Sequence, residues 1–283
     1  MKVIDQTLLE KVIIERSRTS YKGDYGRLLL LGGTYPYGGA IIMAALAAVK
    51  SGAGLVTVGT DRENIPALHG HLPEAMAFSL QDQQLLKEQL EKAEVVLLGP
   101  GLRDDAFGED LVKQVFADLR QNQILIVDGG ALIILARTSL SFPSNQLILT
   151  PHQKEWEKLS GIAIEKQNKD ATASALTSFP QGMILVEKGP ATRIWQAGQS
   201  DYYQLQVGGP YQATGGMGDT LAGMIAGFVG QFRQASLYER VVVATHLHSA
   251  IAQELAQEKY VVLPTEISHE IPKMMKKISQ KST

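Results

Sequence analysis

The sequence contains no cysteine among its 283 residues. Disulfide bonds, thiolate zinc sites and a cysteine nucleophile are therefore excluded. Long hydrophobic segments are also missing, because the longest apolar run is too short and too rich in glycine to span a bilayer. The amino-terminal stretch MKVIDQTLLEKVIIERS has acids within its apolar pattern and lacks the features of a secretory signal. We therefore expect a cytoplasmic protein that does not associate with membranes.

A large excess of charge of either sign is missing as well. The formal net charge is -2, with a sequence pI near 6.3, and this supplies no basic surface for a phosphate backbone. Basic residues gather only at the end, in KMMKKISQKST, which we expect to be a frayed, solvated terminus. Nucleic acid is therefore not an expected partner.

Short apolar runs alternate with longer amphipathic ones along most of the chain. The runs are rich in Leu, Ile and Val, which indicates strands buried on both faces, and their alternation with helices favours parallel pairing. The predicted strands are 27–33, 54–60, 94–100, 123–130, 146–150 and 182–189. The predicted helices between them are 38–52, 82–94, 107–121 and 170–179.

Residues 192–209 break this rhythm. Two alternating runs, ATRIWQA and DYYQLQV, flank a Gly-Gln-Ser turn and predict a β-hairpin. Long helices are expected from about 218 to 232 and from about 237 to 257. The composition, 45% hydrophobic and 20% charged, suffices for a sizeable core, and no domain linker is evident. We expect a single α/β domain, 1–283, with a mostly parallel sheet and an antiparallel edge.

Polar and glycine-rich clusters follow nearly every predicted strand. In open parallel sheets, ligands bind at the carboxyl ends of the strands, where loops lead into helices. The clusters at these ends are GGTYPYGGA, GPGLRDD, DGGAL, TPHQKE and EKGPAT. The sequence therefore predicts a site along this one rim.

The segment ATGGMGDTLAGMIAGF places Gly216, Gly218 and Asp219 at the start of a helix. Glycines allow backbone N–H groups to converge on an anion, and the helix N-terminus adds a positive partial charge. A carboxylate beside such a site can take a proton from a hydroxyl that attacks phosphorus. Alternatively, Asp219 is a structural acid that stabilises the helix N-terminus.

Five other clusters each leave a structural alternative open. His152 and Glu155 lie on one face if a helix begins at Pro151, so Glu155 either binds Mg²⁺ through water or caps the helix. Lys188, with Thr192 across a Gly-Pro turn, either pairs with nucleotide phosphates or is a solvated lysine. Asp128, at a strand end, either holds a metal-bound water or caps the next helix. The glycines of GPGL and GGTYPYGGA either line a pocket or form tight turns; neither GxGxxG nor a Walker A motif is present.

The order of these motifs carries a family resemblance. YKGDYGRLLLLGG, YGGAIIMAALAAVKSGAGLVTVG, GPGL, DGGAL, LTPHQKE, EKGPAT and ATGGMGDTLAGMIAGF together resemble the ADP- or ATP-dependent NAD(P)H-hydrate dehydratases, from about residue 20 to residue 255. KSGAGLVTV together with LTPH is the most particular part of the match. The resemblance implies a ribokinase-like three-layer sandwich, with helices on both faces of the sheet.

The resemblance also implies a reaction. A nucleotide phosphorylates the ring hydroxyl of hydrated NADH or NADPH, and elimination of phosphate restores the cofactor. Bacterial single-domain members imply ADP as the donor, Mg²⁺ as cofactor and a homo-oligomer as the assembly, for which a tetramer is one size. Asp219 would be the catalytic base and a substrate contact. The other implied substrate contacts are Ala40, Gly101 and His152. The implied nucleotide contacts are Lys188, Gly189, Pro190, Ala191, Thr192, Gly216 and Gly218.

The chain departs from the family pattern at three positions. Arg103 stands where another glycine is common, Gly130 replaces a second acid, and Met217 replaces the threonine of Gly-Thr-Gly-Asp. We expect local change near Arg103 and no second acid beside Asp128. Two rival interpretations are a ribokinase-like kinase of a vitamin alcohol (hydroxymethylpyrimidine, thiazole or pyridoxal type) and a non-catalytic nucleotide-binding protein.

Overall fold

The computed structural model describes residues 1–138, 140–143 and 145–280. Its strands are β1 (Arg27–Leu31), β2 (Leu55–Thr60), β3 (Met76–Ser79), β4 (Val95–Leu98), β5 (Ile124–Val127), β6 (Gln146–Leu149), β7 (Ile184–Glu187), β8 (Arg193–Gln196) and β9 (Tyr202–Gln204). Its α-helices are α1 (Gln6–Val12), α2 (Gly38–Lys50), α3 (Asn64–His71), α4 (Gln83–Lys92), α5 (Ala106–Asp118), α6 (Gly130–Arg137), α7 (Gln153–Ser160), α8 (Lys169–Ala175), α9 (Met217–Gln231), α10 (Leu237–Leu255) and α11 (Pro264–Ser279).

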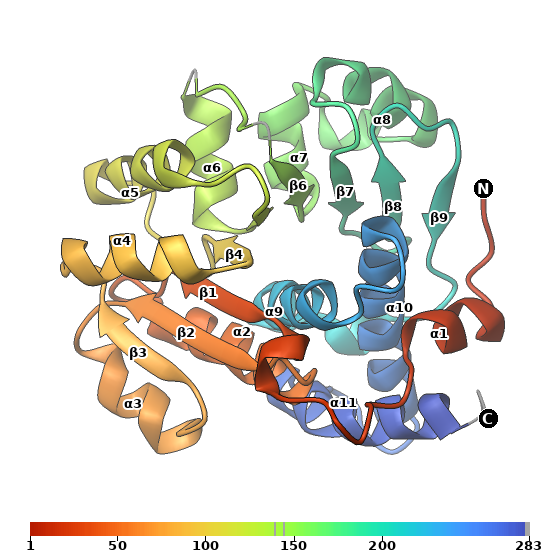
Figure 1. Cartoon of the computed structure of the whole chain (residues 1–283). Helices are drawn as coiled ribbons and strands as arrows, with labels where there is room; N and C mark the ends of the chain where they lie inside the picture. Colours follow the sequence, from red (N-terminus) through yellow and green to blue (C-terminus); the bar gives the residue numbers. More distant parts are fainter. Residues whose placement is uncertain (139, 144, 281–283) are drawn as a thin grey trace.

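Within the described ranges, the strands form one sheet of nine, in the order β3-β2-β1-β4-β5-β6-β7-β8-β9. The pairs from β3 to β7 are parallel, and the pairs β7–β8 and β8–β9 are antiparallel. The antiparallel hairpin forms one edge of the sheet (Figure 1). This confirms the mostly parallel sheet with an antiparallel edge.

The sheet is buried on both faces, and β1 shows why. Its alternate residues Leu28 and Leu30 join the core formed with α1, α2, α9, α10 and α11, whereas Leu29 and Leu31 join the core formed with α4 to α7. Because side chains alternate across a strand, a continuous apolar run supplies both cores. The helix layers on the two faces complete the predicted three-layer sandwich (Figure 1).

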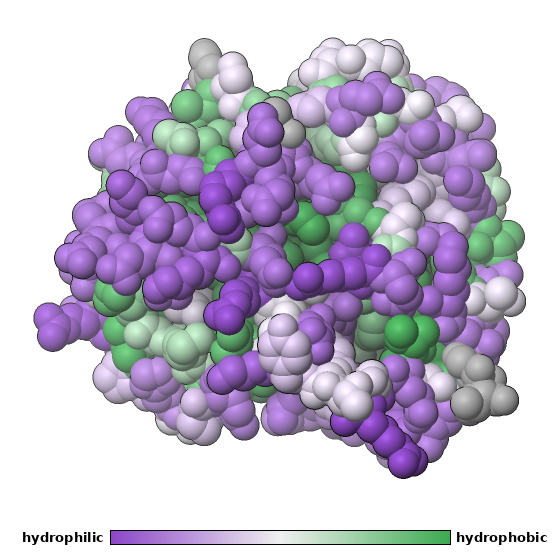
Figure 2. All heavy atoms as spheres, in the orientation of Figure 1, coloured by the Kyte–Doolittle hydropathy of each residue, from purple (hydrophilic) through white to green (hydrophobic). Residues whose placement is uncertain are grey.

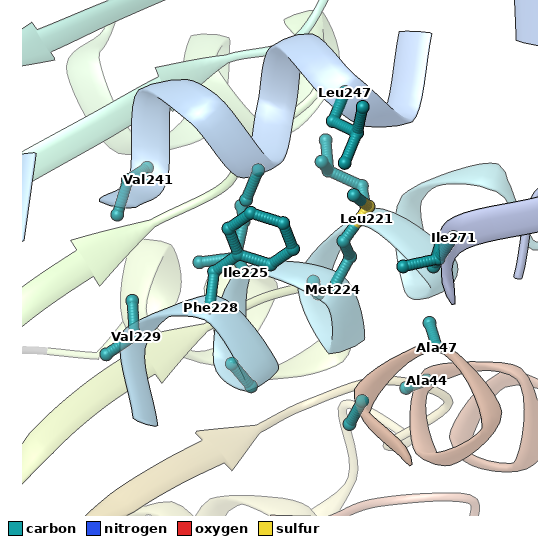
Figure 3. Close-up of a cluster of buried hydrophobic side chains, with 14 of the residues drawn as sticks. Ala44, Ala47, Leu221, Met224, Ile225, Phe228, Val229, Val241, Leu247 and Ile271 are labelled. Carbon is teal, nitrogen blue, oxygen red and sulfur yellow. The ribbon is translucent and has the colours of Figure 1, made fainter. Parts of the chain in front are cut away.

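Helix α9 is buried along nearly its whole length. Leu221, Ile225 and Phe228 face α10, while Met224 lies toward α2 and α11 (Figure 3). A Cβ at Gly223 would lie 2.0 Å from the carbonyl oxygen of Ala44, so only glycine lets α9 approach α2 this closely. The packing fixes the N-terminus of α9 beside the N-terminal half of α2.

Sequence periodicity predicted the central strands and the long helices within a few residues of their observed ends. The short elements β3, α1, α3 and α6 were not predicted, nor was α11. The expectation of a frayed C-terminus is wrong up to Ser279, because α11 continues to that residue, Ile278 is buried and Lys276 pairs with Glu15. Amphipathic packing therefore orders this basic segment.

Hydrophilic side chains dominate the molecular face over α4 and α5, with scattered apolar residues elsewhere in the same view (Figure 2). Among the described residues, no helix has the length and apolar character that a membrane span requires.

Candidate active site

The N-terminus of α9 forms the centre of the candidate site. Gly216 is its N-cap residue, with a φ of 92°, and Asp219 lies in the first turn. The first N–H groups of a helix have no acceptor within the helix, so they are available to an anion. We call the backbone of residues 216–218 the anion hole. Met217 belongs to this turn and packs against the core, so the missing threonine removes a hydroxyl but no backbone amide.

Lys188 brings a positive charge to the same place. A Cβ at Gly218 would lie 3.0 Å from the Lys188 Nζ, so the ammonium lies against the anion hole. Lys188 follows β7, and its Nζ donates to Oδ1 of Asp128, which follows β5, at 2.9 Å. Asp128 is buried and also accepts from the Thr150 hydroxyl at 2.7 Å. The strand ends thus hold the lysine in one position.

Burial and charge shift the pKa values of this cluster. Burial, reinforced by the charge of Asp128 and opposed by Lys188, raises the pKa of Asp219 to about 6. Burial also raises the pKa of Glu155 to about 7, although Lys188 acts against it. Burial lowers the pKa of Lys188, but the carboxylates of Asp128 and Glu155 outweigh it, so the net shift is upward. Lysine therefore stays charged, and Asp219 titrates in the range suited to a general base.

His152 and Glu155 form the N-terminal cap of α7. The Nδ1 of His152 accepts from the backbone N–H of Lys154 and Glu155 at 3.1 and 3.2 Å, and a Glu155 oxygen accepts from the His152 N–H at 2.8 Å. The acceptor role of Nδ1 places the proton of the neutral ring on Nε2, 3.4 Å from Glu155 Oε1. Burial and the nearby Lys188 lower the pKa of His152. The capping role is present, but the helix begins at Gln153 and not at Pro151, so His152 meets Glu155 as the extended N-cap residue of a capping box and not along a helix face.

A cavity of about 230 Å³ opens beside Lys188 on the β7–β8 side. The predicted nucleotide residues Lys188, Gly189, Pro190 and Ala191 line it, together with Gln153, Gln167, Glu187, Arg193 and Gln204. Thr192 is not among the lining residues; its hydroxyl closes the turn through the N–H and carbonyl of Gly189, at 3.3 and 3.1 Å. Thr192 therefore holds the shape of the turn, and the residues before it line the cavity.

Ala40 and Gly101 meet on the other side of the anion hole. A Cβ at Gly101 would lie 2.4 Å from the Tyr37 carbonyl oxygen and 2.9 Å from the Ala40 Cβ, so the loop after β4 lies directly on the start of α2. One turn further along α2, the side chain of Met43 touches Gly216. These contacts bring both predicted substrate residues to the rim next to the anion hole.

The structure therefore gathers the predicted residues that follow β4, β6 and β7, together with Ala40 of α2, around one helix N-terminus, while their roles remain predictions. Asp128 is the residue that sequence reasoning undervalued. Its signal was an acid directly after a buried strand, but the lysine that it holds comes from a strand two positions away in the sheet. The glycine at position 130, where the family pattern has a second acid, also has a structural explanation. A Cβ at Gly130 would lie 1.7 Å from the Leu102 carbonyl oxygen, so an acid does not fit there.

The mostly parallel sheet, the antiparallel hairpin and the anion hole beside an acid are those of the ribokinase-like class. A crystal structure of a ribokinase-like superfamily protein from Enterococcus faecalis superposes with a TM-score of 0.93 at 42% identity, covering 98% of this chain and 96% of the other. An ADP/ATP-dependent NAD(P)H-hydrate dehydratase from Bacillus subtilis, co-crystallised with ATP and Mg²⁺, gives a TM-score of 0.81 at 27% identity, covering 97% of each chain.

Sequence comparison gives the family. The model of the NAD(P)H-hydrate dehydratase family matches residues 28–273. An ADP-dependent (S)-NAD(P)H-hydrate dehydratase from Streptococcus pneumoniae is 90% identical over 280 residues, which is 99% of this chain and 97% of that protein. This chain belongs to the NAD(P)H-hydrate dehydratase family.

Proposed function

We propose that this chain is a lyase that uses ADP to convert hydrated NADH and NADPH back to the reduced cofactors. The observation that carries the proposal is the placement of Asp219, whose carboxyl has a pKa of about 6, in the first turn of α9 beside the Lys188 ammonium. A protein that only bound nucleotides would gain nothing from a carboxylate facing a phosphate. The family membership and the strongly similar pneumococcal relative support the same function.

In the first step, the Asp219 carboxylate accepts the proton of the ring hydroxyl, and the hydroxyl oxygen attacks the terminal phosphorus of ADP. The P–O bond to the leaving nucleotide breaks, and AMP departs with the electron pair. The amides of the anion hole and Lys188 stabilise the charge that spreads over the transferring phosphoryl oxygens. Lys188 is suited to this because Asp128 holds it in place and keeps it charged.

In the second step, the phosphorylated ring loses phosphate. The C–O bond breaks with its electrons on the leaving phosphate, the adjacent carbon gives its proton to that phosphate, and the C–H electrons form the ring double bond. Phosphorylation is useful because phosphate leaves far more readily than hydroxide. The anion hole that bound the phosphoryl group in transfer is also in position to stabilise the phosphate as it departs.

Mg²⁺ belongs to the proposal as a cofactor. No group of three or more His, Cys, Asp or Glu side chains in the described ranges is arranged to hold a metal ion. Mg²⁺ commonly takes only one or two carboxylates and fills its remaining positions with water and phosphate, which Glu155 beside the anion hole fits. When bound, the ion would neutralise phosphate charge, with Glu155 as its protein contact through water.

Three further parts of the proposal rest on the family resemblance or on the proposed reaction. Residues 1–283 act as one catalytic domain, and the protein assembles as a homo-oligomer, with a tetramer as the expected size. It works in the cytoplasm, where NADH, NADPH and ADP are held.

The test is to incubate the protein with hydrated NADH or hydrated NADPH, Mg²⁺ and either ADP or ATP. The proposal expects recovery of the absorbance of the reduced nicotinamide, release of free phosphate and, with ADP, production of AMP. A stable phosphoester of a vitamin alcohol, with no conversion of either hydrate, would instead establish the rival kinase.

A further inference from the structure

The loops that follow β1 and β4 form one continuous surface beside Ala40. The Thr34 N–H and the Thr34 hydroxyl donate to the Gly101 carbonyl at 2.9 and 3.1 Å, and the Arg103 N–H donates to the Thr34 hydroxyl at 2.8 Å. This surface, which we call the β1–β4 rim, lies on the opposite side of the anion hole from the cavity beside Lys188. If two reactants meet at Asp219, one can lie in the cavity beside Lys188 and the other over the β1–β4 rim.

Packing fixes the backbone of Arg103 within this rim. The Leu102 carbonyl oxygen occupies the space of a Gly130 side chain, with only 1.7 Å to the position of a Cβ. The Arg103 carbonyl oxygen lies 2.1 Å from the position of a Gly108 Cβ. Glycines at the starts of α5 and α6 therefore let the loop lie directly against both helices, and Arg103 projects from a rigid base.

The guanidinium of Arg103 is also held in one orientation. Its Nε donates to Asp105 Oδ2 at 2.8 Å, a second N–H donates to the same oxygen, and Nη1 lies 3.4 Å from the Tyr35 carbonyl oxygen. Asp105 is itself fixed, because its other oxygen caps α5 through the Gly108 N–H at 3.0 Å. The Arg103 side chain remains 49% exposed, and Asp105 and Tyr35 engage only part of its five N–H donors.

The proposed substrate needs such a cation. A hydrated dinucleotide with its reacting ring at Asp219 carries two bridging phosphates, and in the NADPH form a further phosphate on the adenosine ribose. The phosphate donor takes the cavity beside Lys188, so the rest of the dinucleotide leaves the site over the β1–β4 rim. An arginine fork held by a carboxylate matches phosphate oxygens in geometry and charge.

We propose that Arg103 binds a phosphate of the hydrated dinucleotide that is remote from the reacting ring. This rests on the proposed function, and it makes Arg103 a residue that selects dinucleotides over smaller hydrated substrates. The contact is the same before and during the reaction, so it contributes to KM and not to kcat.

The test measures the steady-state kinetics of Arg103→Ala with each hydrated cofactor. The expected result is a KM raised about tenfold for at least one hydrate, with kcat and the KM of ADP within about twofold of wild type, as befits one exposed charged hydrogen-bonding group. A raised KM for both hydrates would mean that Arg103 contacts the bridging phosphates. A raised KM for hydrated NADPH alone would mean that it contacts the phosphate on the adenosine ribose. Arg103→Lys should fall between Arg103→Ala and the wild type.

Arg233→Ala is the matched control. Arg233 also pairs with a carboxylate, Glu94 at 2.7 Å, and is 51% exposed, but Glu94 precedes β4 and therefore lies at the amino ends of the strands, away from the β1–β4 rim. Unchanged KM values for both hydrates in an active Arg103→Ala enzyme, or a fall in kcat alone, would overturn the phosphate contact and leave the proposed function standing. Failure of the wild type to convert either hydrate would overturn the proposed function itself.

Discussion

The Lys188 ammonium lies 2.9 Å from the Asp128 carboxylate, with strand β6 between the two strands that carry them. The pair brings a charged lysine to the N-terminus of α9, where the backbone amides already favour an anion. A buried lysine without such a partner would lose charge, because burial disfavours the ammonium form. Asp128 thus maintains the cation that the anion hole requires.

Replacing Lys188 should affect the nucleotide more than the hydrated cofactor. Lys188→Ala removes the cation beside Gly218, and hydrogen bonds to charged groups contribute about 1.5–3 kcal/mol, so nucleotide affinity should fall by about 10- to 100-fold. Calorimetry with ADP and with each hydrate, measured separately, checks the difference. The assignment of Lys188 to the nucleotide would be contradicted by equal weakening of both ligands.

Asp219→Asn tests the proposed general base. The amide keeps the size of the side chain but cannot accept the proton, so turnover should fall by about 10² to 10⁴ while ADP binding stays nearly intact. Asp170→Asn is a suitable control, because Asp170 also lies in the first turn of a helix, α8, on the exposed surface. Turnover of Asp219→Asn within a few-fold of wild type would reject the assignment.

The pH dependence of the reaction follows from the same carboxyl. A general base must be deprotonated, and burial raises the pKa of Asp219 to about 6, so kcat/KM should rise with pH and level off above about 6. Glu155 has a pKa of about 7, so the profile is best measured in both the wild type and Glu155→Gln. An acid limb centred near pH 4 in both proteins would show that the base is not Asp219.

The raised pKa of Asp219 also predicts a stability effect. The Asp219 carboxyl binds its proton more tightly in the folded state than in the unfolded state. Its ionisation therefore lowers the free energy of unfolding progressively as the pH rises from about 4 to about 6. At pH 8, Asp219→Asn should therefore melt about 5–10 °C higher than wild type, because a rise of the pKa from its usual 3.8 to about 6 corresponds to about 3 kcal/mol. The difference should vanish near pH 4, and thermal melts at both pH values check it. A lower melting temperature for Asp219→Asn at pH 8 would mean that the ionised carboxylate stabilises the fold.

The sequence predicted the parts of the fold that depend on local periodicity. The continuous apolar run of β1 and the alternating runs of β8 and β9 were sufficient to place a buried parallel core and an antiparallel edge. The four-residue strand β3 was missed because Met76–Ser79 has neither a clear alternation nor a long apolar run. The bounds of α6 were not predicted, although a helix after Asp128 was considered, because its first residue, Gly130, was assigned to the end of the preceding strand.

The site was predictable where the signal is local, as in the glycines and acid at the start of α9. Two features depend instead on contacts between distant segments. Asp128 and Lys188 meet only because the sheet order places β5 and β7 on either side of β6. The fixed position of Arg103 depends on glycines in α5 and α6 that allow the backbones to touch. No sequence pattern within a single segment indicates either contact.

Gly130→Ala tests whether this close approach is required. An added Cβ would lie 1.7 Å from the Leu102 carbonyl oxygen, a backbone atom that cannot rotate away, so the loop must move or the helix must shift. We expect a loss of about 1–3 kcal/mol, the usual cost of overpacking, together with weaker binding of the hydrated substrate because Arg103 moves with the loop. Gly70→Ala in α3 is the matched control: a Cβ there meets nothing within 4 Å, so the change should be neutral or stabilise the fold by up to about 1 kcal/mol. Chemical denaturation of the two variants measures both effects, and equal stabilities would mean that the loop after β4 yields without cost.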